Sequence, residues 1–416
     1  MVQLMARDEH WREKELSIRE VINKYPEVSP FVIIKTDAQR RGVEFTEKAL
    51  EKVDKSIHQV VYRGFAGERD SNIPVAILLR DGTSVIAGPV GAEAARDPLI
   101  VDVIDGKVVL RDGTDVLEEV FYWEKPDFYD KFTSSGKPMW HIASARPQRI
   151  DINPHQYCQF WDTPGHGCKY CSIAAAYKNG NKPRLLYLND IEETVREALK
   201  QPGRLTSIFL TGGTILDGKE LLDDEVELYI NILKRIGKNF GDKRFPSQLI
   251  GTAFSRKQLQ RIHDETGLMS YTADIEVLNE ELFNWICPGK AAEIGYQEWK
   301  DRLYQAVDIF GRGYVNTGLV AGVEMATPRG FKSEDESLGK MLEEAEELCK
   351  HGVSPVGCVW KVGPGSIFFN QVTPSLEYYV RLAKGFDELR RKYKISVDMD
   401  NYRRCGNHPD SDLSRV

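Results

Sequence analysis

Short apolar runs alternate with longer amphipathic segments along the chain from residue 149 onward. The runs have the length and β-branched content of buried strands, whereas the segments between them repeat apolar residues every three or four positions, as helices do. Strands are predicted within residues 149–157, 207–213, 247–254, 268–277, 315–324 and 353–360. Helices are predicted at residues 189–201, 223–237, 255–267, 278–286, 296–313, 337–352 and 376–394, the first with Asn189 or Asp190 as its N-cap.

This alternation predicts an α/β fold in which helices cover a parallel sheet. Six strand–helix units favour a partial (βα)6 TIM-type barrel within residues 149–416, with a C-terminal extension. A doubly wound open sheet is the alternative. In both folds the active site lies at the carboxyl ends of the strands. The loop after the first predicted strand therefore lies where chemistry is expected.

Residues 1–148 have a different pattern and are predicted to form a smaller α+β domain. After an N-terminal helical stretch, strand-like runs occur at residues 57–64, 74–79, 83–88, 99–104, 107–110 and 116–123. The dipeptides Asp81-Gly82, Asp105-Gly106 and Asp112-Gly113 favour hairpins, because glycine supplies the positive φ of tight turns. The tips, such as Asp81 and Asp112, are expected to be exposed. Because the domain carries no cluster of catalytic residue types, we expect a lid or docking role, with a purely structural packing domain as the alternative.

Composition and charge narrow the range of functions. The 416 residues are 41% hydrophobic and 29% charged, which is typical of a globular protein. The net charge of −7 argues against non-specific nucleic-acid binding. The charged N-terminus is unlike a signal peptide, and no window approaches about eighteen apolar residues, so we expect no membrane partner. Seven cysteines, an odd number, are expected to be reduced thiols in a cytoplasmic protein.

Three of these cysteines lie in one short segment, CQFWDTPGHGCKYC. Cys158, Cys168 and Cys171 have the spacing C-x9-C-x2-C, and a reducing compartment disfavours a disulfide between them. Three thiolates bind zinc if His155 or His166 adds a fourth ligand. They also bind a [4Fe–4S] cluster, in which one iron then remains open for a substrate or cofactor. The spacing by itself leaves both kinds of site open.

The cysteine loop resembles the cluster-binding loop of the radical S-adenosylmethionine (SAM) superfamily. There, three cysteines after the first barrel strand hold a [4Fe–4S] cluster, and SAM chelates the fourth iron through its amino and carboxylate groups. Tyr170 matches the aromatic residue that commonly precedes the last cysteine, whereas the nine residues between Cys158 and Cys168 depart from the usual three. The resemblance implies that Cys158, Cys168 and Cys171 ligate the cluster, with Tyr170 beside the cofactors.

Two further segments at predicted strand ends resemble motifs of the superfamily. Gly212 and Gly213 follow the second strand and resemble the glycine motif whose backbone receives the SAM amino group, although Thr214 stands where an acid is usual. Glycine suits this role because its backbone can approach a ligand closely. Glu276, at the end of the fourth strand, resembles the acid that accepts hydrogen bonds from the SAM ribose.

The fifth predicted strand resembles the glycine-rich strand that packs against adenine. It carries Gly318 and Gly322, and Glu324 lies one residue early. Each motif also has a plain structural interpretation, as a turn, a first-turn helix acid or close strand packing. Lys290 and Arg312 are interpreted as surface charges. Together the four motifs extend the resemblance over roughly residues 150–370.

The resemblance implies an enzyme that cleaves SAM reductively and abstracts hydrogen from a small-molecule or cofactor-precursor substrate. A methylase or sulfur-inserting enzyme is the alternative, and a zinc-stabilised binding protein is a more remote one. The implied cofactors are a [4Fe–4S] cluster and SAM, and the implied electron donor is a reductase, a flavodoxin or a ferredoxin. No catalytic side chain is assigned. Cys287, Cys358 and Cys405 are candidates for a second cluster or for a hydrogen donor.

Overall fold

The computed structural model describes residues 10–53, 74, 76–86, 95–146, 149–179, 184–241, 243–363, 365–395 and 406–413. Within these ranges the strands form two sheets, one of six strands and one of seven. The strand predicted at residues 57–64 and the candidate Cys405 lie outside the described residues. No helix in the described ranges is both long enough and apolar enough to cross a membrane.

Six parallel strands in chain order make up most of the larger sheet. They are β8 (Arg149–Ile152), β9 (Ser207–Thr211), β10 (Ser247–Ile250), β11 (Ser270–Thr272), β12 (Val315–Ala321) and β13 (Ser354–Val359). β7 (Ala143–Arg146) adds an antiparallel strand beside β8. Because the strand order follows the chain order, this sheet is the predicted partial barrel. The doubly wound alternative is wrong, since its strand order would reverse at a switch point.

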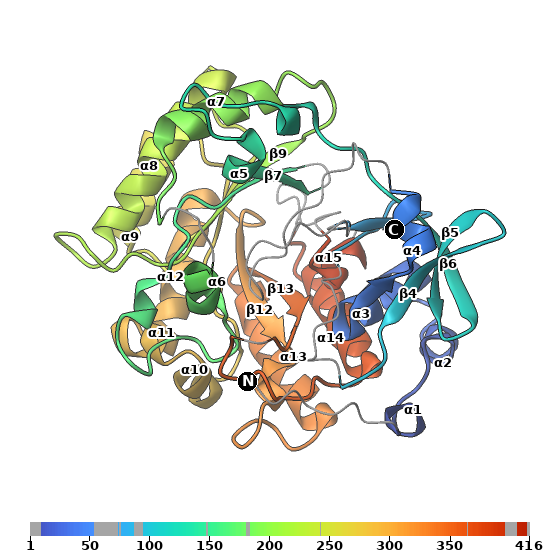
Figure 1. Ribbon diagram of the computed structural model, residues 1–416. Coiled ribbons are helices and arrows are strands. Elements are labelled where there is room, and N and C mark those ends of the chain that lie inside the picture. Colours follow the sequence, from blue (N-terminus) through green and yellow to red (C-terminus); the bar gives the residue numbers. More distant parts are fainter. Residues whose placement is uncertain are drawn as a thin grey trace.

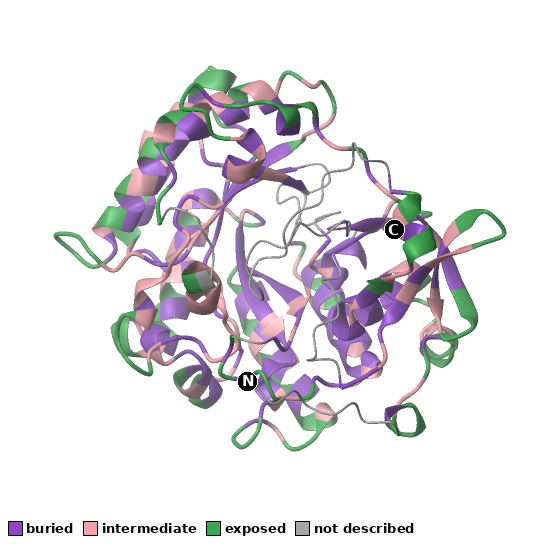
Figure 2. Cartoon of the chain, in the orientation of Figure 1, coloured by how far each residue is buried: buried purple, intermediate pink, exposed green. Residues whose placement is uncertain are grey.

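Helices follow these strands and lie on the outside of the curved sheet (Figure 1). They are α6 (Ile173–Asn179), α7 (Leu188–Ala198), α8 (Asp223–Gly237), α9 (Arg256–Glu265), α10 (Glu280–Ile286), α11 (Pro288–Glu293), α12 (Tyr296–Phe310), α13 (Glu334–Lys350) and α14 (Leu376–Lys392). Short 3₁₀ turns are η2 (Gln159–Trp161), η3 (Lys238–Phe240) and η4 (Val323–Met325). α7–α10 and α12–α14 each bury an apolar face and expose a polar one (Figure 2), whereas the described side chains of α6 are at most partly buried and α11 buries only Gly289 and Lys290.

The predicted N-cap of α7 is wrong. Tyr187 is the N-cap, and Asn189 and Asp190 lie inside the first turn of the helix. Asp190 is buried there and accepts a hydrogen bond from Ser135 Oγ at 2.8 Å. A partner distant in the sequence therefore decides the role of Asp190. By contrast, Ser255 caps α9 with the expected reciprocal hydrogen bonds.

The smaller sheet has the strand order β1-β4-β5-β6-β2-β3. Its strands are β1 (Val43–Phe45), β2 (Ile77–Leu79), β3 (Ser84–Val85), β4 (Leu99–Ile104), β5 (Lys107–Asp112) and β6 (Asp115–Phe121). All pairs are antiparallel except β1 with β4, a pairing that the sequence pattern did not predict. The N-terminal helices are α1 (Trp11–Lys14), α2 (Ile18–Lys24), α3 (Pro30–Arg41) and α4 (Glu47–Glu51), and η1 (Asp127–Asp130) and α5 (Met139–Ile142) precede β7.

The three predicted hairpins form, but Asp112 is not an exposed tip. The turn between β4 and β5 has positive φ at both Asp105 (50°) and Gly106 (78°), as a tight hairpin requires. The carboxylate of Asp112 accepts hydrogen bonds from Arg41 at 2.7 and 2.9 Å and from Arg12 at 2.6 Å. Burial alone would raise the pKa of Asp112, yet these guanidinium groups hold it well below its usual range. Asp112 thus anchors the sheet to α1 and α3.

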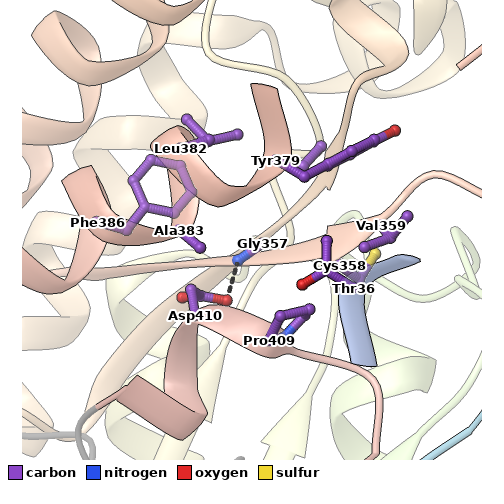
Figure 3. Close-up of a pocket in the computed structure, with 11 residues that line it drawn as sticks. Thr36, Gly357, Cys358, Val359, Tyr379, Leu382, Ala383, Phe386, Pro409 and Asp410 are labelled. Atoms are coloured by element: carbon purple, nitrogen blue, oxygen red, sulfur yellow. Dashed lines mark hydrogen bonds between the residues drawn. The ribbon is translucent and has the colours of Figure 1, made fainter. Parts of the chain in front are cut away.

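The C-terminal segment 406–413, which includes α15 (Pro409–Asp412), connects both sheets. Asp412 pairs with Lys35 of α3 at 2.6 Å, with both side chains fully buried. Asp410 accepts hydrogen bonds from the backbone of Gly357 in β13 at 3.1 Å and from Arg390 of α14 at 2.6 Å (Figure 3). This segment therefore ties α3 to the last strand and last long helix of the barrel.

The core of the smaller sheet also includes residues from the C-terminal part of the chain. These are Leu376, Val380, Ala383 and Leu413. The residues just before β7, in contrast, contribute Phe128, Tyr129 and Ile142 to the core of the barrel. The division of the chain at residues 148 and 149 into two domains stays a prediction.

Candidate active site

The cysteine loop follows β8 at the carboxyl end of the barrel sheet. Cys158 directly precedes η2, Cys168 is buried, and Cys171 lies two residues before α6. A turn closes between the last two, because the N–H of Cys171 donates to the carbonyl of Cys168 at 3.0 Å. The backbone N–H of Ile173 points at Cys171 Sγ at 3.5 Å. The loop thus lies at the face where the sequence predicted chemistry.

The three thiols are close enough to influence one another's ionisation. Burial raises the pKa of Cys158 to about 11, and the nearby Cys168 adds to that rise. Burial likewise raises the pKa of Cys171, again reinforced by Cys168. A hydrogen bond from Cys287 and the charge of Lys290 lower the pKa of Cys168 despite its burial. Cys168 is therefore the thiol that ionises most easily.

A second segment, between α10 and α11, holds the cysteine loop in place. The N–H of Lys169 donates to the carbonyl of Ile286 at 2.9 Å, and the N–H of Gly289 donates to the carbonyl of His166 at 2.9 Å. Cys287 is fully buried between these two contacts, beside Cys168. Burial raises the pKa of Cys287 well above its usual value. Cys287 is thus a neutral thiol next to the proposed cluster ligand.

The two glycines after β9 pack directly against the start of the cysteine loop. The N–H of Gly213 donates to the carbonyl of His155 at 3.0 Å, and His155 Nδ1 donates to the carbonyl of Gly213 at 2.8 Å. Burial lowers the pKa of His155, so its imidazole is neutral. A Cβ on Gly213 would overlap the carbonyl of Tyr157 and lie 2.8 Å from Cα of Cys158. Glycine is therefore required here by the protein itself, and His155 binds the glycine turn rather than a metal.

Gly213→Ala is expected to displace the cysteine loop and to reduce the iron content of the reconstituted protein severalfold. The reason is steric, because the new methyl group would meet backbone atoms of Tyr157 and Cys158, which cannot rotate away. Gly339→Ala is the matched control: no atom lies within 4 Å of its added Cβ, and alanine favours the helix α13 that contains it. Full iron loading of Gly213→Ala would contradict the tight packing.

The end of β11 carries a buried ion pair that corrects the interpretation of Lys290. Lys290 is only 8% exposed and is not a surface charge. Its Nζ donates to Glu276 Oε1 at 2.7 Å and to the carbonyl of Asp274 at 2.5 Å, and lies 4.7 Å from the centre of the Trp299 ring. Glu276 has a positive φ of 73° and pairs through its backbone with β12. Burial, aided by the charge of Glu276, raises the pKa of Asp274 to about 7.

Tyr170 connects this ion pair to the cysteines. It is packed against the barrel core, and its hydroxyl hydrogen-bonds Cys168. Burial and the nearby charge of Glu276 raise the pKa of Tyr170 well above its usual value. The structure therefore brings Cys158, Cys168, Cys171, Tyr170 and Glu276 to one end of the barrel.

Gly318 and Gly322 of the fifth barrel strand are explained by packing against protein groups. The N–H of Gly318 donates to Asp274 Oδ1 at 2.8 Å, and an added Cβ would overlap that carboxylate. Gly322 has a φ of 101°, and its Cβ would overlap the hydroxyl of Tyr379. Glu324 is fully buried and accepts hydrogen bonds from the backbone of Gly322 at 2.9 and 3.0 Å. Contact of this strand with adenine stays a prediction.

The other described cysteines, Cys287, Cys349 and Cys358, lie on separate elements. Cys349 is buried in α13, and Cys358 of β13 lines a small cavity with Thr36 and Tyr379 (Figure 3). No three Cys, His, Asp or Glu side chains among the described residues converge as the ligands of one metal ion.

The donor set fits a [4Fe–4S] cluster better than a single metal ion. Each cysteine of such a cluster binds a different iron, so the three sulfur atoms need not converge on one point, whereas the ligands of a zinc ion must. The loop supplies three soft thiols, and no described His side chain joins them as a fourth ligand. Three of the four irons of a cluster would then bind cysteine, and the fourth iron would remain open to another ligand. The buried Glu276–Lys290 pair and the glycine turn lie beside this loop, where that ligand would bind.

Comparison with known proteins agrees with this geometry. The family model described as the radical SAM superfamily matches residues 158–322. A bacteriochlorophyllide c C-7(1)-hydroxylase from Chlorobaculum limnaeum is 25% identical over 295 residues, which cover 68% of this chain and 69% of that protein.

Solved structures with a similar arrangement include a methylornithine synthase, with 14% identity and a TM-score of 0.40 over 61% of this chain and 72% of that one. A radical SAM methyltransferase from Sphaerobacter thermophilus has 16% identity and a TM-score of 0.40 over 74% of this chain and 80% of its own. With the cysteine loop, the glycine turn and the Glu276–Lys290 pair at one end of the barrel, residues 158–322 form a radical SAM region, and the chain is an enzyme whose cofactors are a [4Fe–4S] cluster and SAM.

Proposed function

We propose that Cys158, Cys168 and Cys171 ligate the [4Fe–4S] cluster and that SAM binds between this loop, the turn at Gly212 and Gly213, and Glu276. When bound, the reduced cluster and SAM supply reductive cleavage of the SAM sulfonium bond and a radical that abstracts hydrogen. The observation that carries the proposal is the set of contacts joining these elements: Gly213 packs on Cys158, and Lys290, which pairs with Glu276, also acts on Cys168.

The chain's own residues bind, orient and shield these groups. In the proposal, the carboxylate of Glu276 accepts hydrogen bonds from the ribose hydroxyls while its other oxygen is held by Lys290. Backbone groups at Gly212 and Gly213 receive the amino group, and Gly318 and Gly322 face the adenine. Phe160, at 2% exposure, belongs to the cysteine loop and packs against Gly289. Its ring, with Tyr170, excludes water from the thiol side of the site.

The proposed reaction is hydrogen abstraction from a C–H bond of a small molecule or cofactor precursor. The hydroxylase relative supports this class, because its name describes action on one carbon substituent of a chlorophyll-type pigment. The enzyme needs an electron donor, for which we propose a reductase, a flavodoxin or a ferredoxin in a reducing cytoplasm. The described cysteines are all free thiols, which suits such a compartment.

For the smaller sheet we propose a lid or docking role at the barrel mouth. Lys361, in the segment after β13, donates to the carbonyl of Ile86, which follows β3, at 3.0 Å. The backbone N–H of Ile86 donates to the carbonyl of Gly406 at 3.1 Å. These contacts place the end of the β2–β3 hairpin beside the carboxyl end of the last barrel strand.

The proposal is tested by SAM cleavage without substrate. Anaerobically reconstituted protein, reduced with dithionite and given SAM, is expected to release 5′-deoxyadenosine and methionine in equal amounts. Protein prepared without iron and sulfide is the control and should release neither. A fully iron-loaded protein that leaves SAM intact, and does not bind it in equilibrium dialysis, would contradict the proposed function.

A further inference from the structure

Thr214 stands where the resembled glycine motif has an acid, and a buried carboxylate lies behind it. Thr214 Oγ1 is 2.8 Å from Thr252 Oγ1. Thr252 Oγ1 is in turn 2.9 and 3.1 Å from the two carboxylate oxygens of Glu225. The exposed fractions of Thr214, Thr252 and Glu225 are 8%, 4% and 2%, so water does not substitute for these contacts. The three side chains form one continuous hydrogen-bonded chain.

Glu225 is fixed in this position by backbone donors from two loops. The N–H of Ile215, after β9, donates to Glu225 Oε2 at 2.9 Å. The N–H of Thr252, after β10, donates to Oε1 at 3.0 Å. Glu225 itself comes from the first turn of α8. Three donors thus converge on one carboxylate at the ends of two neighbouring barrel strands, the hydroxyl of Thr252 sharing its one proton between both oxygens, and these are bonds that favour an ionised acid.

The chain has a direction when Glu225 is ionised. A carboxylate only accepts hydrogen bonds, so the hydroxyl of Thr252 must donate to Glu225. The oxygen of Thr252 then accepts the proton of the Thr214 hydroxyl. Thr214 is left with oxygen lone pairs and no proton to donate, which makes it an acceptor beside Gly212 and Gly213. An amino group whose lone pair is bound to iron has only N–H donors left and is the complementary ligand.

We propose that Glu225, acting through Thr252 and Thr214, replaces the missing acid of the glycine motif and orients the Thr214 oxygen toward the N–H groups of the α-amino group of SAM. Glu225 is a positioning residue, because it lies two hydroxyl groups away from the ligand. This inference rests on the proposed binding of SAM at Gly212 and Gly213. The competing arrangement has the Thr214 hydroxyl donating to Cys158, with which it also makes a hydrogen bond.

The proposed role of Glu225 makes SAM affinity depend on pH. Burial raises the pKa of Glu225 to about 7, while hydrogen bonds from Thr252 and Ile215 and the charge of Lys290 oppose that rise. The hydroxyls of Tyr229 and Tyr271 also face Glu225. As the pH falls through about 7, Glu225 gains a proton and no longer requires Thr252 to donate. The amino group, with its lone pair on the iron, keeps only N–H donors in this range. Affinity for SAM should therefore fall.

The experiment measures SAM binding to the cluster-loaded protein by anaerobic calorimetry. Glu225→Gln and Thr214→Val are each expected to weaken SAM binding roughly tenfold, the size of one lost charge-assisted hydrogen bond. The double variant should bind SAM no more weakly than Thr214→Val alone, because both changes interrupt one chain. Thr214→Ser should bind like wild type. The fall in SAM affinity below pH 7 should be smaller in Glu225→Gln than in wild type. Because Asp274 is present in both proteins, a difference between them does not come from the titration of Asp274.

Two controls separate positioning from general damage. 5′-Methylthioadenosine lacks the amino group, so its affinity should be equal in wild type and every variant. Asp190→Asn alters another buried carboxylate, at 2% exposure, far from this turn and should not change SAM binding. If Glu225→Gln folds poorly, Thr252→Val interrupts the chain while leaving Glu225 and its backbone donors in place.

Wild-type SAM affinity in Glu225→Gln and Thr252→Val would overturn the inference and favour donation from Thr214 to Cys158. Equal losses for SAM and 5′-methylthioadenosine would also overturn it, because they would indicate a distorted pocket. Failure of the wild-type protein to bind SAM at all would instead refute the proposed function, and the inference with it.

Discussion

Replacing Cys158, Cys168 or Cys171 with alanine is expected to remove most of the iron from the reconstituted protein and to abolish SAM cleavage. The three thiols lie on one loop, and Cys168 influences the ionisation of both others. With one thiolate missing, a second iron of the cluster would lack a protein ligand, and clusters held by two cysteines lose iron readily. Iron and sulfide content and the absorbance near 400 nm of each variant measure the result.

The other described cysteines provide matched controls. Cys349→Ala removes a fully buried thiol in α13 and should lower only the free energy of unfolding, with a full cluster. Cys287→Ser keeps a hydrogen-bond donor beside Cys168 and should also retain the cluster. Retention of a full cluster by a variant that lacks all three loop cysteines would show that other residues hold it.

The barrel could be predicted because its local and overall signals agree. The helix α8 begins and ends where the apolar repeat of residues 223–237 does, and Ser255 caps α9 as its sequence indicates. The sheet order then follows from short connections and right-handed crossovers. The sequence predicts less of the N-terminal sheet. The three-residue strand β1 exists because it pairs with β4, and no periodicity marks it.

The helix α3 shows most clearly what a local pattern omits. Its last turns contain Lys35, Asp37, Arg40 and Arg41, which suggest a solvated face, yet all four are buried. They are buried because their partners come from elsewhere, among them Asp112 at 2.7 Å from Arg41 and Asp412 at 2.6 Å from Lys35. Buried charges require such partners, and sequence spacing does not reveal them.

The parts of the candidate site that belong to a local sequence motif could be predicted. The parts that depend on contacts between residues distant in the sequence could not. The cysteine loop, Gly213 and Glu276 lie at strand ends that the pattern places on one face. Lys290 was misjudged because its role depends on the fold: α11 returns it to the end of β11, where Glu276 lies. The sequence also does not single out Glu225, since acids in the first turn of a helix ordinarily interact with the helix dipole.

Glu276→Gln is expected to weaken SAM binding roughly ten- to a hundredfold without changing the iron content. The substitution keeps the size of the side chain and an acceptor for Lys290 Nζ, but removes the charge that strengthens hydrogen bonds to the ribose hydroxyls. Calorimetry with SAM and iron analysis measure the two quantities separately. Unchanged SAM affinity in this variant would refute the assignment of Glu276 to the ribose.

Lys290→Met distinguishes the effect of the Glu276–Lys290 pair on SAM affinity from its effect on the stability of the protein. Removing the ammonium group leaves Glu276 buried beside Asp274 with no cation, a change that should lower the free energy of unfolding by about 3–5 kcal/mol. Combining Lys290→Met with Glu276→Gln removes both charges and should restore much of that stability, but not SAM affinity. Lys300→Met is the matched control: Lys300 is 4% exposed and pairs with Glu344 and Glu347 at 3.0 and 2.9 Å, away from the cysteines. It should affect stability alone, so a comparable loss of SAM affinity in Lys300→Met would mean that destabilisation, rather than the Glu276 carboxylate, accounts for weaker binding.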